Sequence, residues 1–352
     1  LIINLNNSYE TGILCEKNTS NSMLNIPSKN VYYIKFYSNS FNIIGNLYLF
    51  LQILKVIIKF KPDLILSFTI KPNIFSSIIS RFINIKNIVN ITGLGTVFLK
   101  NPYLSLLFKT VYYFSLKKTS LIYFQNEFDK KYFINNKIIK SQNFKIIQGS
   151  GVDLKKFHFK ELNNNKEITF SFISRLIVEK GIIELLNAIK TIKLKYPNTI
   201  FNIVGSIDQK NSSSINFKDI EDLKKSNYIN HFNFTDDVIS YINKSDCIIL
   251  PSYREGSSKI LLEAAAIGRP LIASDVPGCN NIVINNFNGF LCKPKDTKSL
   301  IDSIEKFIKL DTVSRKKLAQ NSRKHIEENF DEKFVINQYL NDINHILNEK
   351  KN

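Results

Sequence analysis

The chain has 352 residues, of which 44% are hydrophobic and 22% are charged. This length predicts about two domains, and the composition excludes a disordered or fibrous protein. The four cysteines form no C-x-x-C pair and no Cys/His cluster with zinc spacing. They indicate unpaired thiols in a reducing compartment, and they argue against a zinc module or a disulfide framework.

The formal net charge of +18 is unevenly distributed along the chain. Residues 1–150 hold 18 of the 48 Lys and Arg residues but only 5 of the 30 Asp and Glu residues. This surplus indicates an anionic partner for the first half, and nucleic acid, anionic lipid or a phosphorylated acceptor would each satisfy it. A generally lysine-rich proteome would give the same bias without function. No helix-turn-helix, zinc or RNP-type sequence is present, which disfavours nucleic acid.

The longest apolar stretches, 41–60 and 103–116, are interrupted by polar residues, so we expect no membrane span. No secretory signal is recognisable. The chain begins with Leu1, within a segment that resembles the end of a helix. We therefore expect a first strand and its following loop to be missing ahead of Leu1.

The first half alternates short β-rich runs with segments of helical period. Strands are predicted at 31–37, 62–69, 87–92, 120–126 and 144–151. Helices are predicted at 45–60, 73–83, 103–117 and 127–135.

The second half alternates more regularly. Strands are predicted at 168–174, 199–205, 230–234, 246–252, 270–276 and 289–294. Helices are predicted at 181–196, 217–225, 237–243 and 259–267, and from 296 to the end. Alternation of this kind is typical of doubly wound parallel sheets. We expect an α/β protein with two Rossmann-like domains, residues 1–155 and 156–330. Residues 331–352 are expected to form a helix that packs back toward the first domain.

The segment REGSSKILLE, residues 254–263, follows an apolar strand and opens a helix. Ligands of open α/β sheets bind beyond the carboxyl ends of the strands, and the backbone N–H groups at the start of this helix suit a phosphate. Glu255 and Glu263 could accept hydrogen bonds from sugar hydroxyls. The alternative is a capped, solvated helix with two ordinary glutamates. It is disfavoured because Glu263 lies in the apolar run LLEAAAI, where an unpaired charge is costly.

The segment SRLIVEKG, residues 174–181, places Arg175 after a buried strand and Lys180 before the next helix. A departing nucleoside diphosphate gains negative charge as its bond to the sugar breaks. Two fixed cations stabilise that transition state more than the ground state. Each charge-assisted hydrogen bond of this kind is worth roughly 1.5–3 kcal/mol. Alone, an Arg and a Lys at this spacing are more often ordinary surface residues. They indicate a phosphate site here only in combination with the motif at residues 254–263.

Together these motifs resemble the GT-B glycosyltransferases of family 4, the glycosyl transferases group 1. The resemblance covers most of residues 168–330, and the seven residues between Glu255 and Glu263 match the family's E-x7-E motif. FTIKPNIFSSI at 68–78 and NITGLGTVF at 90–98 resemble one bacterial branch. That branch builds surface polysaccharides and glycans, often on polyprenyl-diphosphate-linked acceptors.

The resemblance implies a role for each matching residue. Arg175 and Lys180 would hold the donor diphosphate, Glu255 the donor sugar and Glu263 the ribose. The remaining donor-site residues would be Gly205, Phe234 and Thr235, the last two near the base, and Gly256, Ser257, Ser258, Lys259 and Ile260 near the phosphates. The family retains anomeric configuration without a side-chain nucleophile. Since the sequence has no D-x-D motif, we expect a metal-independent enzyme without a cofactor.

Acceptor contacts are expected in the first half. Lys71 follows a predicted strand and could contact an acceptor phosphate, and Thr92, Gly93 and Gly95 follow another. An exposed lysine and a plain strand–helix turn are the alternatives. The aromatic and basic stretch 103–118 could lie in a membrane interface or pack on the sheet.

The sequence therefore predicts a retaining glycosyltransferase that uses a nucleotide-sugar, with UDP favoured. The expected acceptor is polyprenyl-diphosphate-linked or otherwise membrane-proximal, which places a bacterial enzyme in the cytoplasm, peripheral on the inner membrane. Two alternatives stay open. One is a catalytically impaired protein of the same fold that binds anions or membranes, and the other is a nucleotide-sugar epimerase.

Overall fold

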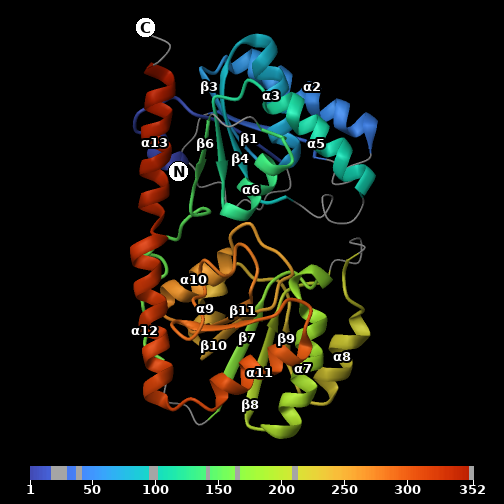
Figure 1. The fold of residues 1–352 in the computed structure, drawn as a ribbon, viewed down its shortest axis with the longest axis vertical. Coiled ribbons are helices and arrows are strands. Elements are labelled where there is room, and N and C mark those ends of the chain that lie inside the picture. The colour runs from blue at the N-terminus through green and yellow to red at the C-terminus, as the bar shows by residue number, and fades with distance from the viewer. Residues whose placement is uncertain are drawn as a thin grey trace. The chain divides into compact units, whose positions relative to one another are not determined.

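The chain forms two compact units in the computed structural model (Figure 1). Unit 1 comprises Leu1–Ile147 and Ile336–Asn352, and unit 2 comprises Gln148–Val335. The division falls before the expected boundary at 155/156, because Val152 bridges to Asp331 and Phe157 lies in the core of unit 2. The structure describes residues 1–16, 30–36, 42–94, 102–139, 143–162, 167–207 and 213–348.

The described residues of unit 1 form two separate parallel sheets. Strand β1 (Gly12–Glu16) pairs with β2 (Asn30–Ile34). The second sheet has the order β3-β4-β5-β6. Its strands are β3 (Leu64–Phe68), β4 (Lys86–Ile91), β5 (Leu121–Phe124) and β6 (Phe144–Ile146). The predicted strands are present with trimmed ends, whereas β1 was not predicted.

The helices of unit 1 follow the predicted pattern closely. They are α1 (Ile2–Leu5), α2 (Ile43–Phe60), α3 (Ile70–Ile83), α5 (Pro102–Leu116) and α6 (Glu127–Asn135). By length and composition alone, helix α2 could cross a membrane. This differs from our expectation that the chain contains no membrane span. The inner face of α2 instead packs Leu49, Ile53 and Ile57 into a core with β2 and α3.

The C-terminal helix α13 (Glu332–Asn348) contributes to unit 1 from Ile336 onward. Its Tyr339 hydroxyl donates to Asn90 on β4, and Asp342 accepts from the Tyr123 hydroxyl on β5. Lys145 Nζ lies 2.5 Å from Asp342 Oδ1. The two hydrogen bonds made by the buried Tyr339 and Tyr123 hydroxyls fix the helix to the strands, because each unmade bond would leave a desolvated polar group.

In the part of unit 2 that the structure describes, the helices surround one six-stranded parallel sheet in the order β12-β11-β10-β7-β8-β9. Its strands are β7 (Ile168–Ile173), β8 (Thr199–Val204), β9 (Asn230–Phe232), β10 (Cys247–Leu250), β11 (Leu271–Ser274) and β12 (Gly289–Cys292). Every residue of β7, β10 and β11 is buried. Strands buried on both faces are expected in a parallel sheet that is covered by helices on both sides.

The helices of unit 2 pack as neighbouring pairs, α7 with α11 and α10 with α12 (Figure 1). They are α7 (Ile182–Lys195), α8 (Phe217–Lys225), α9 (Val238–Asn243), α10 (Lys259–Ile267), α11 (Thr297–Ile308) and α12 (Thr312–Asn329). Helix α10 has the predicted bounds. It ends at Gly268 with φ 87°, the left-handed conformation that favours glycine after a helix.

Candidate active site

The charged motifs of unit 2 lie between β7 and β10, where the order in which the chain adds strands to the sheet reverses. From β7 the chain runs outward through β8 and β9, and from β10 it runs the other way through β11 and β12. Strands β7 and β10 are therefore neighbours at a topological switch point, the place where open α/β sheets bind ligands. Arg175 follows β7, Lys180 ends the short helix η2 (Val178–Lys180), and Glu255 follows β10.

Lys180 and Glu255 form an ion pair across this switch point. Lys180 Nζ lies 2.5 Å from Glu255 Oε1, and the side chains are only 19% and 12% exposed. The Ser252 hydroxyl also donates to Glu255 Oε1 at 2.7 Å. This partial burial strengthens the pair and holds the carboxylate in one orientation.

Arg175 is exposed at the carboxyl end of β7. Its backbone carbonyl accepts a hydrogen bond from Ile177 N–H at 2.9 Å, which fixes the turn. Within the described ranges its guanidinium forms no ion pair. A guanidinium is always charged and presents a planar set of donors, so Arg175 can bind an incoming phosphate group.

The start of α10 corrects one detail of the predicted phosphate cradle. Ser258 is the N-cap residue, but its hydroxyl makes no capping bond and its N–H donates to Gly278 O at 3.0 Å. Among the residues predicted to lie near the phosphates, Ser258 thus already uses its N–H group, because the loop after β11 brings Gly278 O against it. The N–H groups of Lys259 and Ile260 lie in the first helical turn, where no carbonyl of the helix can reach them.

Glu263 is buried one turn into α10 and is paired. Lys259 Nζ lies 3.5 Å from its Oε1, an i,i+4 contact on the same helix face. Burial raises the pKa of the Glu263 carboxyl, and the Lys259 ammonium opposes that shift. The predicted burial is confirmed, while the charge that we treated as unpaired has a partner within its own helix.

The remaining donor-site candidates follow β8 and β9. A side chain at Gly205 would place its Cβ 1.9 Å from Ser174 O, so only glycine fits between the ends of β7 and β8. Phe234 is exposed, and its N–H donates to the Ser206 hydroxyl at 2.9 Å. The Thr235 hydroxyl accepts from Asp237 N–H at 3.1 Å. These residues share the same sheet edge as Arg175.

Sequence reasoning missed the residues that shape the Glu255 loop. Glu255 N–H donates to Pro277 O at 3.3 Å, and Gly278 has φ 80°. A Cβ at Gly278 would lie 2.6 Å from the carbonyl oxygens of Glu255 and Gly256. Ser252 was also missed. The DVPG sequence after β11 was visible, but its pairing with a loop of another strand was not.

We expect Gly278→Ala to impair catalysis more than folding. The new methyl group would displace the Glu255 carbonyl and strain a left-handed backbone, at a cost of roughly 1–3 kcal/mol. Transfer activity should fall at least tenfold because the carboxylate moves with its loop. Steady-state kinetics and thermal unfolding of the same preparation test this. Unchanged kcat with a lowered Tm would show that Gly278 serves stability alone.

The acceptor-side candidates of unit 1 follow the carboxyl ends of two adjacent strands, β3 and β4. Lys71 is the second residue of α3, and its Nζ lies 5.3 Å from the centre of the Phe36 ring. Partial burial lowers the pKa of Lys71. Thr92 and Gly93 follow β4, so they share a sheet edge with Lys71. Gly95 lies outside the described residues.

No metal centre is evident among the residues that the structure describes, since no three His, Cys, Asp or Glu side chains are grouped to hold an ion. Metal independence stays a prediction.

Two family models match the chain. "Glycosyl transferases group 1" matches residues 153–325, and "Glycosyl transferase 4-like" matches residues 3–126. The chain belongs to the group 1 glycosyltransferases, and it is a glycosyltransferase with two Rossmann-like domains of the GT-B fold.

Several curated relatives are glycosyltransferases of glycan assembly. The chain is 27% identical to the Campylobacter jejuni N,N'-diacetylbacillosaminyl-diphospho-undecaprenol alpha-1,3-N-acetylgalactosaminyltransferase, over 86% of this chain and 81% of that one. It is 26% identical to the Escherichia coli UDP-Gal:alpha-D-GlcNAc-diphosphoundecaprenol alpha-1,3-galactosyltransferase, over 85% and 80%. It is 30% identical to the capsular polysaccharide glycosyltransferase CapM of Staphylococcus aureus, over 56% of this chain and half of CapM.

Solved structures share the fold. HepE of Anabaena in complex with UDP superimposes with a TM-score of 0.74 and 18% identity, over 90% of this chain and 86% of that one. Sucrose-phosphate synthase of Thermosynechococcus elongatus has a TM-score of 0.78 and 18% identity, over 99% and 92%.

Proposed function

We propose that this protein is a retaining glycosyltransferase that moves a sugar from a UDP-sugar to a polyprenyl-diphosphate-linked acceptor in bacterial surface glycan assembly. The acceptor is supported by the relatives from C. jejuni and E. coli, whose names specify undecaprenol-diphosphate glycans. The nucleotide is supported by the UDP-Gal donor of the E. coli relative. Enzymes that act on such acceptors work at a membrane, so we propose a peripheral location on the cytoplasmic face.

The observation that carries the proposal is the ion pair of Lys180 and Glu255 at the switch point of unit 2. In the proposed complex, Lys180 and Arg175 bind the donor diphosphate, and Glu255 accepts hydrogen bonds from hydroxyls of the donor sugar. Glu263 accepts from the ribose hydroxyls. Lys259 and Ile260 N–H groups donate to a phosphate oxygen at the positive end of α10. The exposed ring of Phe234 lies beside the base.

The proposed reaction breaks the bond between the anomeric carbon and the diphosphate oxygen. The acceptor hydroxyl oxygen attacks the same face of the sugar, and its proton passes to the departing phosphate oxygen. Arg175 and Lys180 stabilise the charge that grows on the leaving group, so these cations act where other enzymes use a divalent ion. Retention is supported by the alpha-1,3 product of the E. coli relative, because UDP-galactose is itself an alpha glycoside.

A transfer assay tests the proposal. The full chain is incubated in EDTA with UDP-sugars and a short-chain polyprenyl-diphosphate glycan, and products are identified by mass spectrometry. We expect transfer by the wild type, and at least a 100-fold loss in Arg175→Ala and Glu255→Ala. Full activity in both variants would refute the assigned site, and a strict need for a divalent ion would refute metal independence.

The same assay separates the two alternatives. An epimerase would release a new UDP-sugar in the absence of acceptor. A catalytically silent protein would bind neither UDP nor UDP-sugar in calorimetry, and would leave every donor intact. Arg175→Ala is informative in calorimetry too, because loss of an exposed phosphate ligand should weaken UDP binding without altering the fold.

A further inference from the structure

Helix α2 is apolar on both of its faces. Its inner face carries Leu49, Ile53 and Ile57 into the unit 1 core. Only 22% of the helix is buried, however. The outer face exposes Ile44, Leu47, Tyr48, Leu51 and Ile58, whose side chains are 47% to 82% exposed. A surface helix of a water-soluble domain normally turns polar residues outward, so this outer face is built for an apolar environment.

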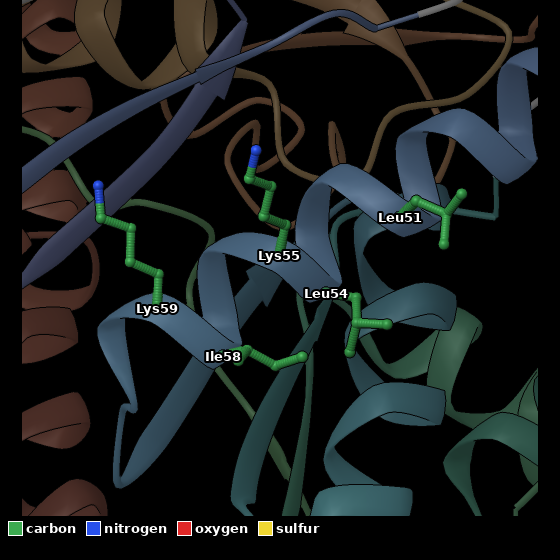
Figure 2. Close-up of a pocket in the computed structure, with 5 residues that line it drawn as sticks. All are labelled: Leu51, Leu54, Lys55, Ile58 and Lys59. Carbon is green, nitrogen blue, oxygen red and sulfur yellow. The ribbon is translucent and has the colours of Figure 1, made fainter.

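Two lysines accompany this apolar stripe. A shallow hollow of about 420 Å³ on the helix is lined by Leu51, Leu54, Lys55, Ile58 and Lys59. Figure 2 shows both lysine side chains extending to one side of the helix, with Leu54 and Ile58 on the other. Aliphatic side chains beside ammonium groups fit the boundary between acyl chains and phosphate headgroups, where lysine stems lie along apolar surface.

The apolar surface extends over the two neighbouring helices. Helix α3 packs against both α2 and α5, and the three helices lie side by side in unit 1 (Figure 1). Phe82 at the end of α3 and Leu106, Leu107 and Phe114 of α5 are exposed large side chains. For residues 103–118 the sequence left membrane contact and packing on the sheet as alternatives, whereas the structure shows a further exposed apolar stripe on α2.

The charge of these three helices favours anionic lipid over a second copy of the chain as the partner of this apolar surface. Helices α2, α3 and α5 contain no Asp or Glu. Their cations are Lys55, Lys59, Lys71, Arg81 and Lys109. A second copy of the chain would bring these cations face to face, which is unfavourable, whereas anionic lipid complements them. The buried inner face of α2 keeps the helix on unit 1, so it would lie in the interface and not span the bilayer.

We infer that the outer face of α2, continued by Phe82 and by α5, docks unit 1 onto an anionic lipid bilayer. The aliphatic stripe enters the headgroup boundary while Lys55 and Lys59 bind lipid phosphates. This inference rests on the proposed membrane-linked acceptor, for which it supplies the surface that holds the enzyme at the bilayer.

Vesicle sedimentation with the full chain tests the inference. We expect binding to phosphatidylcholine vesicles that contain phosphatidylglycerol, weak binding to phosphatidylcholine alone, and weakening by salt. Leu51→Glu with Ile58→Glu should reduce binding at least tenfold. Lys55→Glu with Lys59→Glu should reduce it by about 30-fold or more, from the loss of two cations near the lipid surface.

Two control variants match these changes on unit 2. Leu194→Glu with Val313→Glu replaces two apolar residues that are more exposed than Leu51 and Ile58, and Lys218→Glu with Lys225→Glu makes the same change in net charge as the lysine variant of α2. Both should bind vesicles like the wild type. The inference would be overturned if the wild-type protein did not bind anionic vesicles, or if the α2 variants bound them as well as the controls do. The inference would also be overturned if the wild type formed a dimer that dissociates in the Leu51/Ile58 variant and bound no vesicles.

Transfer in detergent to a short-chain acceptor separates this inference from the proposed function. We expect the α2 variants to keep wild-type transfer there, because their donor site is intact. If no protein transfers sugar but vesicle binding depends on α2 as stated, the proposed function fails and the docking surface stands.

Discussion

Lys180→Ala should lower kcat by about 100- to 1,000-fold, with a smaller change in KM. Lys180 is paired with Glu255 at 2.5 Å, so part of its charge is already neutralised. As the diphosphate departs, its negative charge grows and the ammonium interacts with it most strongly in the transition state. Removing one fixed donor for a developing oxyanion costs about 2.7–4 kcal/mol in a preorganised site, which gives the stated range.

Among the described residues, the variant also leaves Glu255 with Ser252 as its one remaining side-chain donor. We therefore expect Lys180→Arg to recover part of kcat, since it restores a cation, although its planar head does not reproduce the geometry. Lys190→Ala on the exposed side of α7 is the matched control and should behave as wild type. Steady-state kinetics at saturating UDP-sugar measure the effect. A kcat within twofold of wild type would remove Lys180 from the catalytic centre.

The fold of unit 2 was predictable because its signals are local. The run CIIL is buried on both faces, and Gly268 stops α10 where the sequence indicates. Strand β1 was missed because GILCE carries a weak strand signal. Its stability comes from pairing with β2, far along the chain and invisible in a local window.

Some features of the candidate site were likewise visible in the local sequence, whereas others depend on which strands are neighbours in the sheet. The E-x7-E spacing is local and was visible, and so was the i,i+4 spacing of Lys259 and Glu263, although we did not use it. The pairing of Lys180 with Glu255 was not predictable in detail, because it depends on β7 and β10 being neighbours in the sheet. The hydrogen bond from Ser258 N–H to Gly278 O likewise was not predictable, because it depends on the loop that follows another strand, β11.

Glu263→Gln should weaken UDP binding by roughly tenfold while making the protein more stable at neutral pH. The carboxylate can accept from both ribose hydroxyls, and an amide offers one acceptor oxygen without charge. A hydrogen bond to a charged group is worth roughly 1.5–3 kcal/mol, of which the amide keeps part. Calorimetric titration with UDP measures the loss. Unchanged affinity would place the ribose elsewhere.

The gain in stability follows from the raised pKa of Glu263, which burial causes. Below the ordinary pKa of 4.5 the carboxyl is protonated in the folded and unfolded states, so the wild type and Glu263→Gln should be equally stable. As the pH rises from 4.5 through the raised folded-state pKa, the unfolded chain releases its proton first and the wild type loses stability relative to the variant. Above that window the difference is constant.

Glu305→Gln is a control of opposite sign for this pH dependence. The Lys195 ammonium lies 2.7 Å from Glu305 and lowers the pKa of that carboxyl, so its charged form stabilises the folded chain above pH 4.5. The Glu305 variant should therefore be less stable than wild type at neutral pH, while its UDP affinity stays unchanged. The Glu305 difference should shrink only as the pH falls below 4.5, so urea unfolding from about pH 3 to about pH 8 measures both pH dependences. A Glu263 variant that loses stability as well as UDP affinity would mean that its pairing with Lys259 outweighs the cost of burial, and the carboxylate would then serve the fold as well as the donor.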